Sequence, residues 1–394
     1  MRRSRHPRIR LPGLPSLRVV AVRVNGRMGG WTDGWSERQL PLLPSGDPPT
    51  RPSALPVLDE RLRGTRFVTL QPKSVLNSPE QTGMDFWSLN PYVGCEFGCT
   101  YCYARYTHRY VVERAHDAGT LSDREFSDYR GAHGWEAFEQ RIFVKQQIQD
   151  ALEHDLRRYF RRPEAAGSSD AIVIGTATDP YQPGERRFKI TRAVLARLAR
   201  CEGLSIGLIT KSPLVTRDMD LFTEIQRRND LEIHLSLMTL DVALIRRLEA
   251  RSPMPAVRLR ALERLTAAGV NAGLIVAPVL PGITDAVERL DALFQAARGA
   301  GARFLSASPL RLYPGIRDRF LPVLDEHFPQ LSARYRRAYA DRGAAPREYT
   351  RALARRVKRL QLKYNFATRE MRDRYERRQP RPQGELELTV PLSP

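Results

Sequence analysis

Residues 90–103 have the sequence NPYVGCEFGCTYCY and contain three of the four cysteines in this chain of 394 residues. Cys95, Cys99 and Cys102 follow the spacing Cys-x3-Cys-x2-Cys, whereas Cys201 lies far along the chain. Four cysteines in so long a chain are too few for a disulfide framework. A cluster of free thiols instead indicates a reducing compartment, so we expect a cytoplasmic protein with a metal or cluster site on this loop.

The spacing of the three thiols favours an iron–sulfur cluster over zinc. Thiolates are the soft ligands that iron–sulfur clusters need. Three protein ligands would leave one iron of a [4Fe–4S] cluster open for another molecule. A structural zinc site is the alternative, but it needs a fourth, tetrahedral ligand, and His108 is the only nearby candidate. Zinc sites also usually take paired Cys or Cys/His units, which this triplet is not.

Beyond the cysteine loop, short apolar segments alternate with segments of helical periodicity. Strands are expected near residues 86–89, 171–175, 204–210, 231–237, 272–278 and 302–306. Helices are expected at 146–160, 191–200, 218–228, 242–268 with a break near Pro253, and 286–298. This alternation predicts an α/β fold with a parallel sheet covered by helices. Six βα units fit a partial (β/α)6 barrel, and a doubly wound open sheet is the alternative.

The two ends of the chain differ from this central part. Residues 1–60 start with many arginines and no acid, which fits a basic leader without stable structure or a transit peptide. We expect the barrel in residues 61–320, with a polar loop at 119–134. A helical extension is expected in 321–378, with helices at 331–339 and from 347 onward. The proline-rich residues 379–394 should form a frayed tail.

The net charge of +20 comes almost entirely from arginine, because only six of the 64 basic residues are lysine. Such an excess is typical of nucleic-acid binding, but a GC-rich coding sequence would also replace lysine by arginine. A basic group on the expected C-terminal helix also allows two interpretations, a nucleic-acid face or a solvated surface. It is formed by Arg355, Arg356, Lys358, Arg359 and Lys363. No segment is apolar enough for a membrane span.

Polar motifs follow the expected strands, at the end of the sheet where barrel active sites gather. They are GTATDPYQP at 175–183, Thr210-Lys211-Ser212, Ser236-Leu237 and APVLPG at 277–282. The cysteine loop, with Tyr101 just before the third cysteine, resembles the signature of the radical S-adenosylmethionine (SAM) superfamily. With the other motifs, residues 65–365 are similar to the members related to spore photoproduct lyase.

This resemblance implies an enzyme whose [4Fe–4S] cluster binds SAM and cleaves it reductively, giving a 5′-deoxyadenosyl radical that removes a hydrogen from a substrate. It also implies a one-electron reductant of the flavodoxin or ferredoxin type. Charge and resemblance together suggest a nucleic-acid substrate. The alternative from another class is a non-catalytic iron–sulfur or zinc protein that binds nucleic acid.

The resemblance also implies roles for particular residues. Cys95, Cys99 and Cys102 match the cluster ligands. Tyr101 matches an aromatic near the adenine of SAM, and Tyr103 a tyrosine used in radical transfer. Polar residues at strand ends match residues that contact the carboxylate and ribose of SAM. They are Lys211, its neighbour Ser212, and Ser236.

Other positions are less specific. Pro278 and Pro281 either shape a loop against adenine or only bend it. Asp179, Tyr181 and Gln182 either face the substrate or form a turn, because Asp-Pro often opens turns.

One position departs from the lyase pattern. Thr176 stands where the lyase has a cysteine that returns a hydrogen atom to the product radical. An alkyl hydroxyl is a much poorer hydrogen-atom donor than a thiol. Cys201 is no substitute, because it closes a helix and should lie at the opposite end of the barrel. We therefore do not expect repair of spore photoproduct by the lyase's route.

Overall fold

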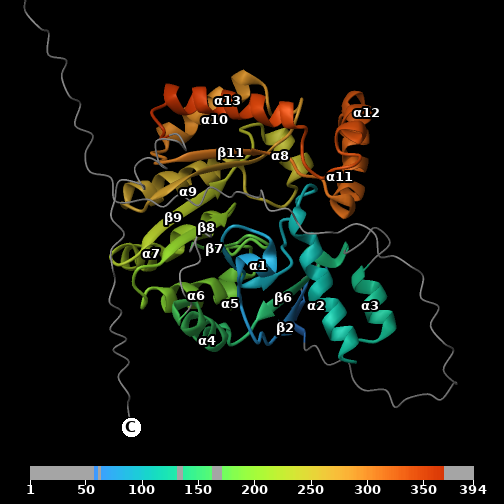
Figure 1. The fold of residues 1–394 in the computed structure, drawn as a ribbon, viewed down its shortest axis with the longest axis vertical. Helices are drawn as coiled ribbons and strands as arrows, with labels where there is room; N and C mark the ends of the chain where they lie inside the picture. Colours follow the sequence, from blue (N-terminus) through green and yellow to red (C-terminus); the bar gives the residue numbers. More distant parts are fainter. Residues whose placement is uncertain (1–56, 61–63, 131–135, 162–170, 368–394) are drawn as a thin grey trace, which may run out of the picture.

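The computed structural model describes residues 57–60, 64–130, 136–161 and 171–367. Most of the expected leader, the tail at 379–394 and any continuation of the last helix beyond residue 367 lie outside the described residues. Within them, two sheets and their helices form the fold (Figure 1).

The larger sheet contains six parallel strands whose spatial order is also their order along the chain. These strands are β4 (Trp87–Leu89), β7 (Ile172–Ile174), β8 (Ser205–Thr210), β9 (Asp230–Ser236), β10 (Ala272–Val279) and β11 (Leu305–Pro309). The short β3 (Leu76–Asn77) pairs antiparallel with β4 at one edge. A doubly wound sheet would reverse its strand order at a switch point. The sequential order therefore confirms the predicted partial-barrel arrangement.

Helices connect successive parallel strands, as the alternating pattern predicts. The connections carry α4 (Ile148–Arg161) before β7, α5 (Glu185–Phe188) and α6 (Ile190–Leu198) before β8, α7 (Met219–Gln226) before β9, α8 (Val242–Leu248) and α9 (Pro255–Ala267) before β10, and α10 (Val287–Gly299) before β11. The break between α8 and α9 confirms the one expected near Pro253. Buried apolar side chains from strands and helices form one continuous core.

A second sheet, which the sequence did not predict, lies beside the cysteine loop. Its strands occur in the order β1 (Val57–Glu60), β2 (Arg66–Leu70), β6 (Arg141–Lys145) and β5 (Tyr92–Val93). β2 and β6 are parallel, and the other two pairs are antiparallel. Because β5 ends two residues before Cys95, this sheet determines where the cysteine loop begins.

The prediction of a loop at 119–134 is wrong for the central part of this segment. That part forms helix α3 (Asp123–Arg130), which follows the long α2 (Tyr106–Asp117). Ser122 and Glu125 form a capping box, because the Glu125 carboxylate accepts from the Ser122 backbone and the Glu125 backbone donates to the Ser122 hydroxyl. Phe126 and Tyr129 then pack against a small apolar cluster beside β6. Two aromatic contacts and a cap thus stabilise a helix within a polar segment.

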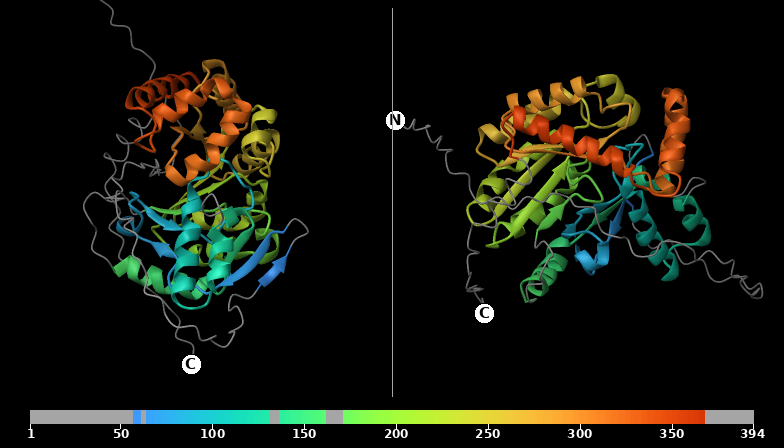
Figure 2. Two further views of the ribbon diagram at one scale, coloured as in Figure 1. Left: turned by 90° about the vertical axis from the view of Figure 1, so that its right-hand side faces the viewer. Right: turned by 45° about the horizontal axis from the view of Figure 1, so that its top comes forward.

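The C-terminal extension consists of α11 (Pro314–His327), α12 (Pro329–Ala338) and α13 (Arg347–Lys363). The expected boundary at residue 320 lies inside α11. Helix α13 buries Leu353, Val357 and Leu360 and contacts α10 and β11 (Figure 2). The extension therefore covers the last strand of the barrel. In the described part of the chain, no helix is long and apolar enough to cross a membrane.

Candidate active site

The backbone of the cysteine loop is hydrogen-bonded at its start to the short helix η2 (Glu136–Glu139), which precedes β6 of the second sheet. The Cys95 N–H donates to the Phe138 carbonyl at 3.1 Å, and the Cys102 N–H to the Cys99 carbonyl at 3.2 Å. Gly94 has a φ of 91°, and a β carbon there would lie 2.7 Å from the Phe138 carbonyl oxygen. Glycine is therefore the residue that this close approach requires.

The three thiols are free of disulfides; Cys95 and Cys99 are buried and Cys102 is half-buried. Burial raises the pKa of Cys95, Cys99 and Cys102, so the protein alone disfavours the thiolates that metals need. Among the described residues, no group of His, Cys, Asp and Glu converges as the ligands of one metal ion would. A [4Fe–4S] cluster takes each thiolate on a different iron, and three soft donors on one loop fit that group.

His108, the candidate fourth ligand for zinc, is committed elsewhere. Its Nε2 lies 2.7 Å from the Arg141 carbonyl oxygen of β6, and its ring packs near Phe138 and Phe143. Burial lowers the pKa of His108 to about 4, so the ring is neutral and its Nε2 acts as the donor. His108 therefore belongs to the apolar packing of α2 on the second sheet.

Three of the predicted cofactor-binding residues lie together where β8 and β9 end. The Lys211 ammonium donates to the Ser236 hydroxyl at 2.9 Å and lies 5.9 Å from the centre of the Tyr101 ring. Only 15% of the Lys211 side chain is exposed. A cation, a hydroxyl and an aromatic ring thus meet beside the cysteine loop, although they come from distant parts of the chain.

Two further charged residues, which the sequence did not reveal, complete this group. Glu249, directly after α8, accepts hydrogen bonds from the Tyr101 hydroxyl and the Arg258 guanidinium, and its Oε1 lies 3.8 Å from the Lys211 ammonium. Burial acts to raise the pKa of Glu249, but the charges of Lys211 and Arg258 outweigh it and lower the pKa to about 2. Glu249 is therefore an anion between two cations.

Asp179 is placed in a turn that uses both of its carboxylate oxygens. Its Oδ1 accepts from the Thr210 hydroxyl at 2.6 Å and the Tyr181 N–H at 2.9 Å, and its Oδ2 from the Lys211 N–H at 2.7 Å. Burial raises the pKa of Asp179, and these hydrogen bonds oppose that shift. The carboxylate joins the loops after β7 and β8.

The neighbouring predicted residues also make contacts within the protein. Gln182 accepts from the Glu96 N–H at 3.0 Å and donates to the Gly94 carbonyl at 3.3 Å, so it ties the loop after β7 to the cysteine loop. Ser212 accepts from the Leu214 N–H at 3.3 Å, at the start of the short helix η3 (Pro213–Asp218). Pro278 lies near the end of β10, after a cis peptide bond.

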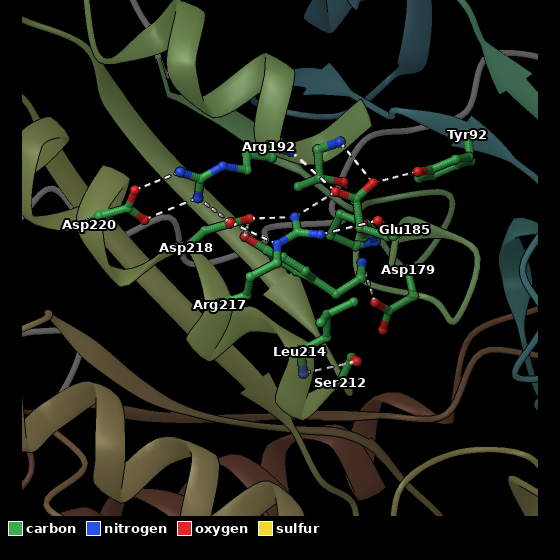
Figure 3. Close-up of polar contacts among 12 residues, drawn as sticks. Tyr92, Asp179, Glu185, Arg192, Ser212, Leu214, Arg217, Asp218 and Asp220 are labelled. Atoms are coloured by element: carbon green, nitrogen blue, oxygen red, sulfur yellow. Dashed lines mark hydrogen bonds and ion pairs between the residues drawn. The ribbon is translucent and has the colours of Figure 1, made fainter. Parts of the chain in front are cut away.

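Behind these loops lies a buried ionic network (Figure 3). The Arg217 guanidinium donates to Glu185 and to Asp218, each at 2.7 Å, and both carboxylates are fully buried. Tyr92 of β5 donates to Glu185, and Arg192 donates to Asp218 at 2.6 Å. The network therefore joins the second sheet to the loops after β7 and β8, and it holds the base of the site in place.

Tyr103 and Thr176 are neighbours in space. The Tyr103 hydroxyl donates to the Thr176 carbonyl, and the Thr176 hydroxyl lies 2.6 Å from the Ser88 hydroxyl. Cys201 lies between α6 and β8, where its sulfur is 3.1 Å from the Arg197 guanidinium. It is thus at the amino end of β8, opposite the cysteine loop, as expected.

Comparison with known proteins agrees with this arrangement. The profile of the Radical SAM superfamily matches residues 89–294. An uncharacterized protein of Mycobacterium tuberculosis is 32% identical over 306 residues, which cover 77% of this chain and 82% of that protein. An uncharacterized protein of Methanocaldococcus jannaschii is 26% identical over 219 residues, 56% of this chain and 70% of the relative.

Among solved structures, a spore photoproduct lyase variant with bound AdoMet and dinucleoside spore photoproduct has a TM-score of 0.54 at 14% identity, covering 76% of this chain and 79% of the lyase. That likeness shows the fold alone. The profile match over half of the chain, together with the mycobacterial relative, shows that this protein belongs to the radical SAM superfamily, whose members use a [4Fe–4S] cluster and SAM.

Proposed function

We propose that Cys95, Cys99 and Cys102 hold the [4Fe–4S] cluster, and that the protein cleaves SAM reductively to start a radical reaction on a nucleic-acid substrate. The observation that carries this proposal is the meeting of Lys211, Ser236 and Tyr101 beside the cysteine loop. When bound, the cluster supplies the single electron that SAM cleavage requires, from a flavodoxin- or ferredoxin-type donor in a reducing cytoplasm.

The residues of the chain bind and orient SAM. The Lys211 ammonium is the partner for its carboxylate, since charge-assisted hydrogen bonds are the stronger kind. The Ser236 hydroxyl binds the ribose, and Tyr101 and Pro278 line the adenine. Ser212 and Asp179 act through the loop, because their side chains fix the backbone on either side of Lys211.

Exposed tyrosines beside the cysteine loop support a nucleic-acid substrate. Tyr103, Tyr106 and Tyr110 are 39%, 36% and 41% exposed and follow one another at helical spacing. The rings of Tyr106 and Tyr110 meet edge to face at 6.1 Å. Bases stack on such aromatic side chains, and each stacked base typically contributes about 1–3 kcal/mol. The net charge of +20 favours the same class of partner.

The C-terminal helix gives weaker support. Arg356 donates to the Asp285 carbonyl, and Lys363 pairs with Asp291 at 2.6 Å. These two members of the expected basic group therefore stabilise the fold. Arg355 and Arg359 remain exposed on α13 and are the better candidates for phosphate contacts.

Tyr103 is our candidate for a radical relay, because a phenolic O–H bond is much weaker than an alkyl one. Its hydroxyl already donates to the loop that carries Thr176. Because position 176 carries no thiol, the final radical would have to be quenched by a step that differs from the one in the lyase.

The test is anaerobic reconstitution with iron and sulfide, reduction with dithionite, and measurement of 5′-deoxyadenosine and methionine from SAM. Both products should form in equal amounts. A non-catalytic iron–sulfur protein would bind iron without forming either product, and a zinc protein would take up zinc in place of iron. The nucleic-acid assignment is tested separately, by the salt dependence of DNA and RNA binding.

A further inference from the structure

We propose that Glu249 is a positioning residue for SAM: with Arg258 it holds Lys211 in the arrangement that receives the carboxylate of SAM. This inference rests on the proposed function, in which Lys211 binds that carboxylate. Glu249 itself does not contact SAM in this proposal, and it acts through the Lys211 side chain.

The contacts of Glu249 join four separate parts of the fold. Its carboxylate accepts from Tyr101 of the cysteine loop and from Arg258 of α9, and it pairs with Lys211 after β8. The preceding carbonyl, that of Leu248, accepts from the Thr100 N–H at 3.0 Å. The end of α8 is therefore one of the points at which the cysteine loop meets the strand ends of the barrel.

Arg258 pairs with Glu249 and makes several further contacts within the protein. Its guanidinium also donates to the Ser236 carbonyl at 2.7 Å, the Pro253 carbonyl at 2.8 Å and the Ser252 hydroxyl at 2.6 Å, and its side chain is fully buried. Four of its five N–H donors are therefore used within the protein, and full burial keeps the guanidinium away from solvent. A buried carboxylate beside a single cation would be costly, so this second cation lets Glu249 stay charged.

Lys211 differs from Arg258 in that its side chain is partly exposed and keeps an N–H donor for another molecule. An ammonium group has three donors, and the contacts to Ser236 and Glu249 leave at least one for another acceptor. The charges of Lys211, Arg258 and Glu249 add up to one positive charge, so these three side chains together attract a carboxylate. Free lysine side chains sample many rotamers, and Glu249 orders this one before the ligand arrives.

Without the Glu249 charge, Lys211 and Arg258 would repel each other across the buried site. Lys211 would then turn toward solvent, and SAM binding would have to reorder it. If Glu249 only competed with the SAM carboxylate for Lys211, removing the Glu249 charge would strengthen SAM binding. The two roles therefore predict opposite changes in affinity.

The experiment compares SAM binding by the cluster-loaded, unreduced wild type with that of Glu249→Gln, Lys211→Met and the double variant. The probes are SAM and decarboxylated SAM, each by equilibrium dialysis, with iron content and the cluster spectrum measured on the same samples. Glu263→Gln, on the exposed face of α9, is the matched control.

We expect Glu249→Gln to bind SAM on the order of tenfold more weakly, with wild-type iron content and unchanged affinity for decarboxylated SAM. In the double variant, the loss should equal that of Lys211→Met alone, because Glu249 acts through Lys211. A purely structural role would weaken both ligands equally and lower the iron content.

Wild-type or tighter SAM binding by Glu249→Gln, equal losses for the two probes, or additive losses in the double variant would each overturn the inference. If Glu249→Gln does not fold, Glu249→Asp keeps the charge for Arg258 but withdraws it from Lys211, and it should show the same selective loss. A wild type that does not bind SAM overturns the proposed function together with this inference, whereas wild-type SAM cleavage with an unaffected variant overturns the inference alone.

Discussion

Replacing Gly94 with alanine should destabilise the protein and impair cluster assembly together. Gly94 lies between β5 and Cys95 with a φ of 91°. A β carbon there would lie 2.7 Å from the Phe138 carbonyl oxygen, 2.9 Å from that of Arg141 and 3.0 Å from a methyl group of Ile142. Two of these three neighbours are backbone atoms, which cannot rotate out of the way.

The magnitude follows from two separate effects. A left-handed backbone costs an L residue roughly 1–2 kcal/mol, and overpacking adds about 1–3 kcal/mol. We therefore expect Gly94→Ala to lower the free energy of unfolding by about 2–5 kcal/mol. The same clash pushes the loop away from Phe138, whose carbonyl accepts the Cys95 N–H. Less iron should be bound per chain for that reason.

Gly83→Ala is the matched control, because Gly83 has a φ of 66° but no heavy atom within 4 Å of the added carbon. It should show the backbone cost alone, roughly 1–2 kcal/mol, with full iron content. The measurements are urea unfolding under anaerobic conditions and iron per chain after reconstitution. Equal losses in the two variants, with equal iron content, would refute the argument from close packing.

Further predictions concern the ligands, SAM, pH and the substrate. Cys99→Ala should abolish the binding of about four irons per chain, whereas Cys201→Ala should leave it intact; iron retained by Cys99→Ala would remove that thiol from the ligand set. Lys211→Met should weaken SAM binding on the order of tenfold to a hundredfold at unchanged iron content, and unchanged affinity would place Lys211 away from SAM. Because burial lowers the pKa of His108 to about 4, the unfolded state binds the extra proton between about pH 6.5 and 4. Stability should therefore fall by about 3 kcal/mol as the pH drops through that window, and unfolding curves of His108→Gln should lack this part of the pH dependence. Reduced enzyme with SAM should not restore thymine in spore-photoproduct DNA, because Thr176 is a poor hydrogen-atom donor; thymine recovery over many turnovers would contradict this.

The sequence was sufficient to predict the parallel sheet and the cysteine loop. Strands such as Ile172–Ile174 are apolar on both faces because helices cover one face and the core fills the other. The spacing of these strands along the chain was enough to predict six βα units. The last strand was placed about three residues too early, because Ala302 is buried as a strand residue would be but still belongs to the turn after α10.

The second sheet escaped prediction for a physical reason. Its strand β5 has two residues, and β2 and β6 begin with arginines that lie at the sheet's margin. The two residues of β5 acquire their pairing only from tertiary contacts, and the local sequences of β2 and β6 do not show which strands they pair with. Helix α3 is different, because its capping box of Ser122 and Glu125 is a helix signal in the sequence, which the polar composition of the segment outweighed in the prediction. The order of the strands in this sheet depends on residues far apart in the chain.

Only some of the charged residues of the site could be predicted from the sequence. A barrel places its functional groups after the strands, and the family resemblance together with this position led to Lys211 and Ser236. Glu249 and Arg258 lie instead at the junction of two helices, where the sequence shows only a proline-rich break. Yet a buried lysine requires a counter-charge, and a buried carboxylate requires its own cations. The group that balances Lys211 therefore had to exist somewhere in the fold. Its identity follows only from the return of the α8–α9 junction to the cysteine loop, which brings Glu249 to Tyr101 and Lys211 at once.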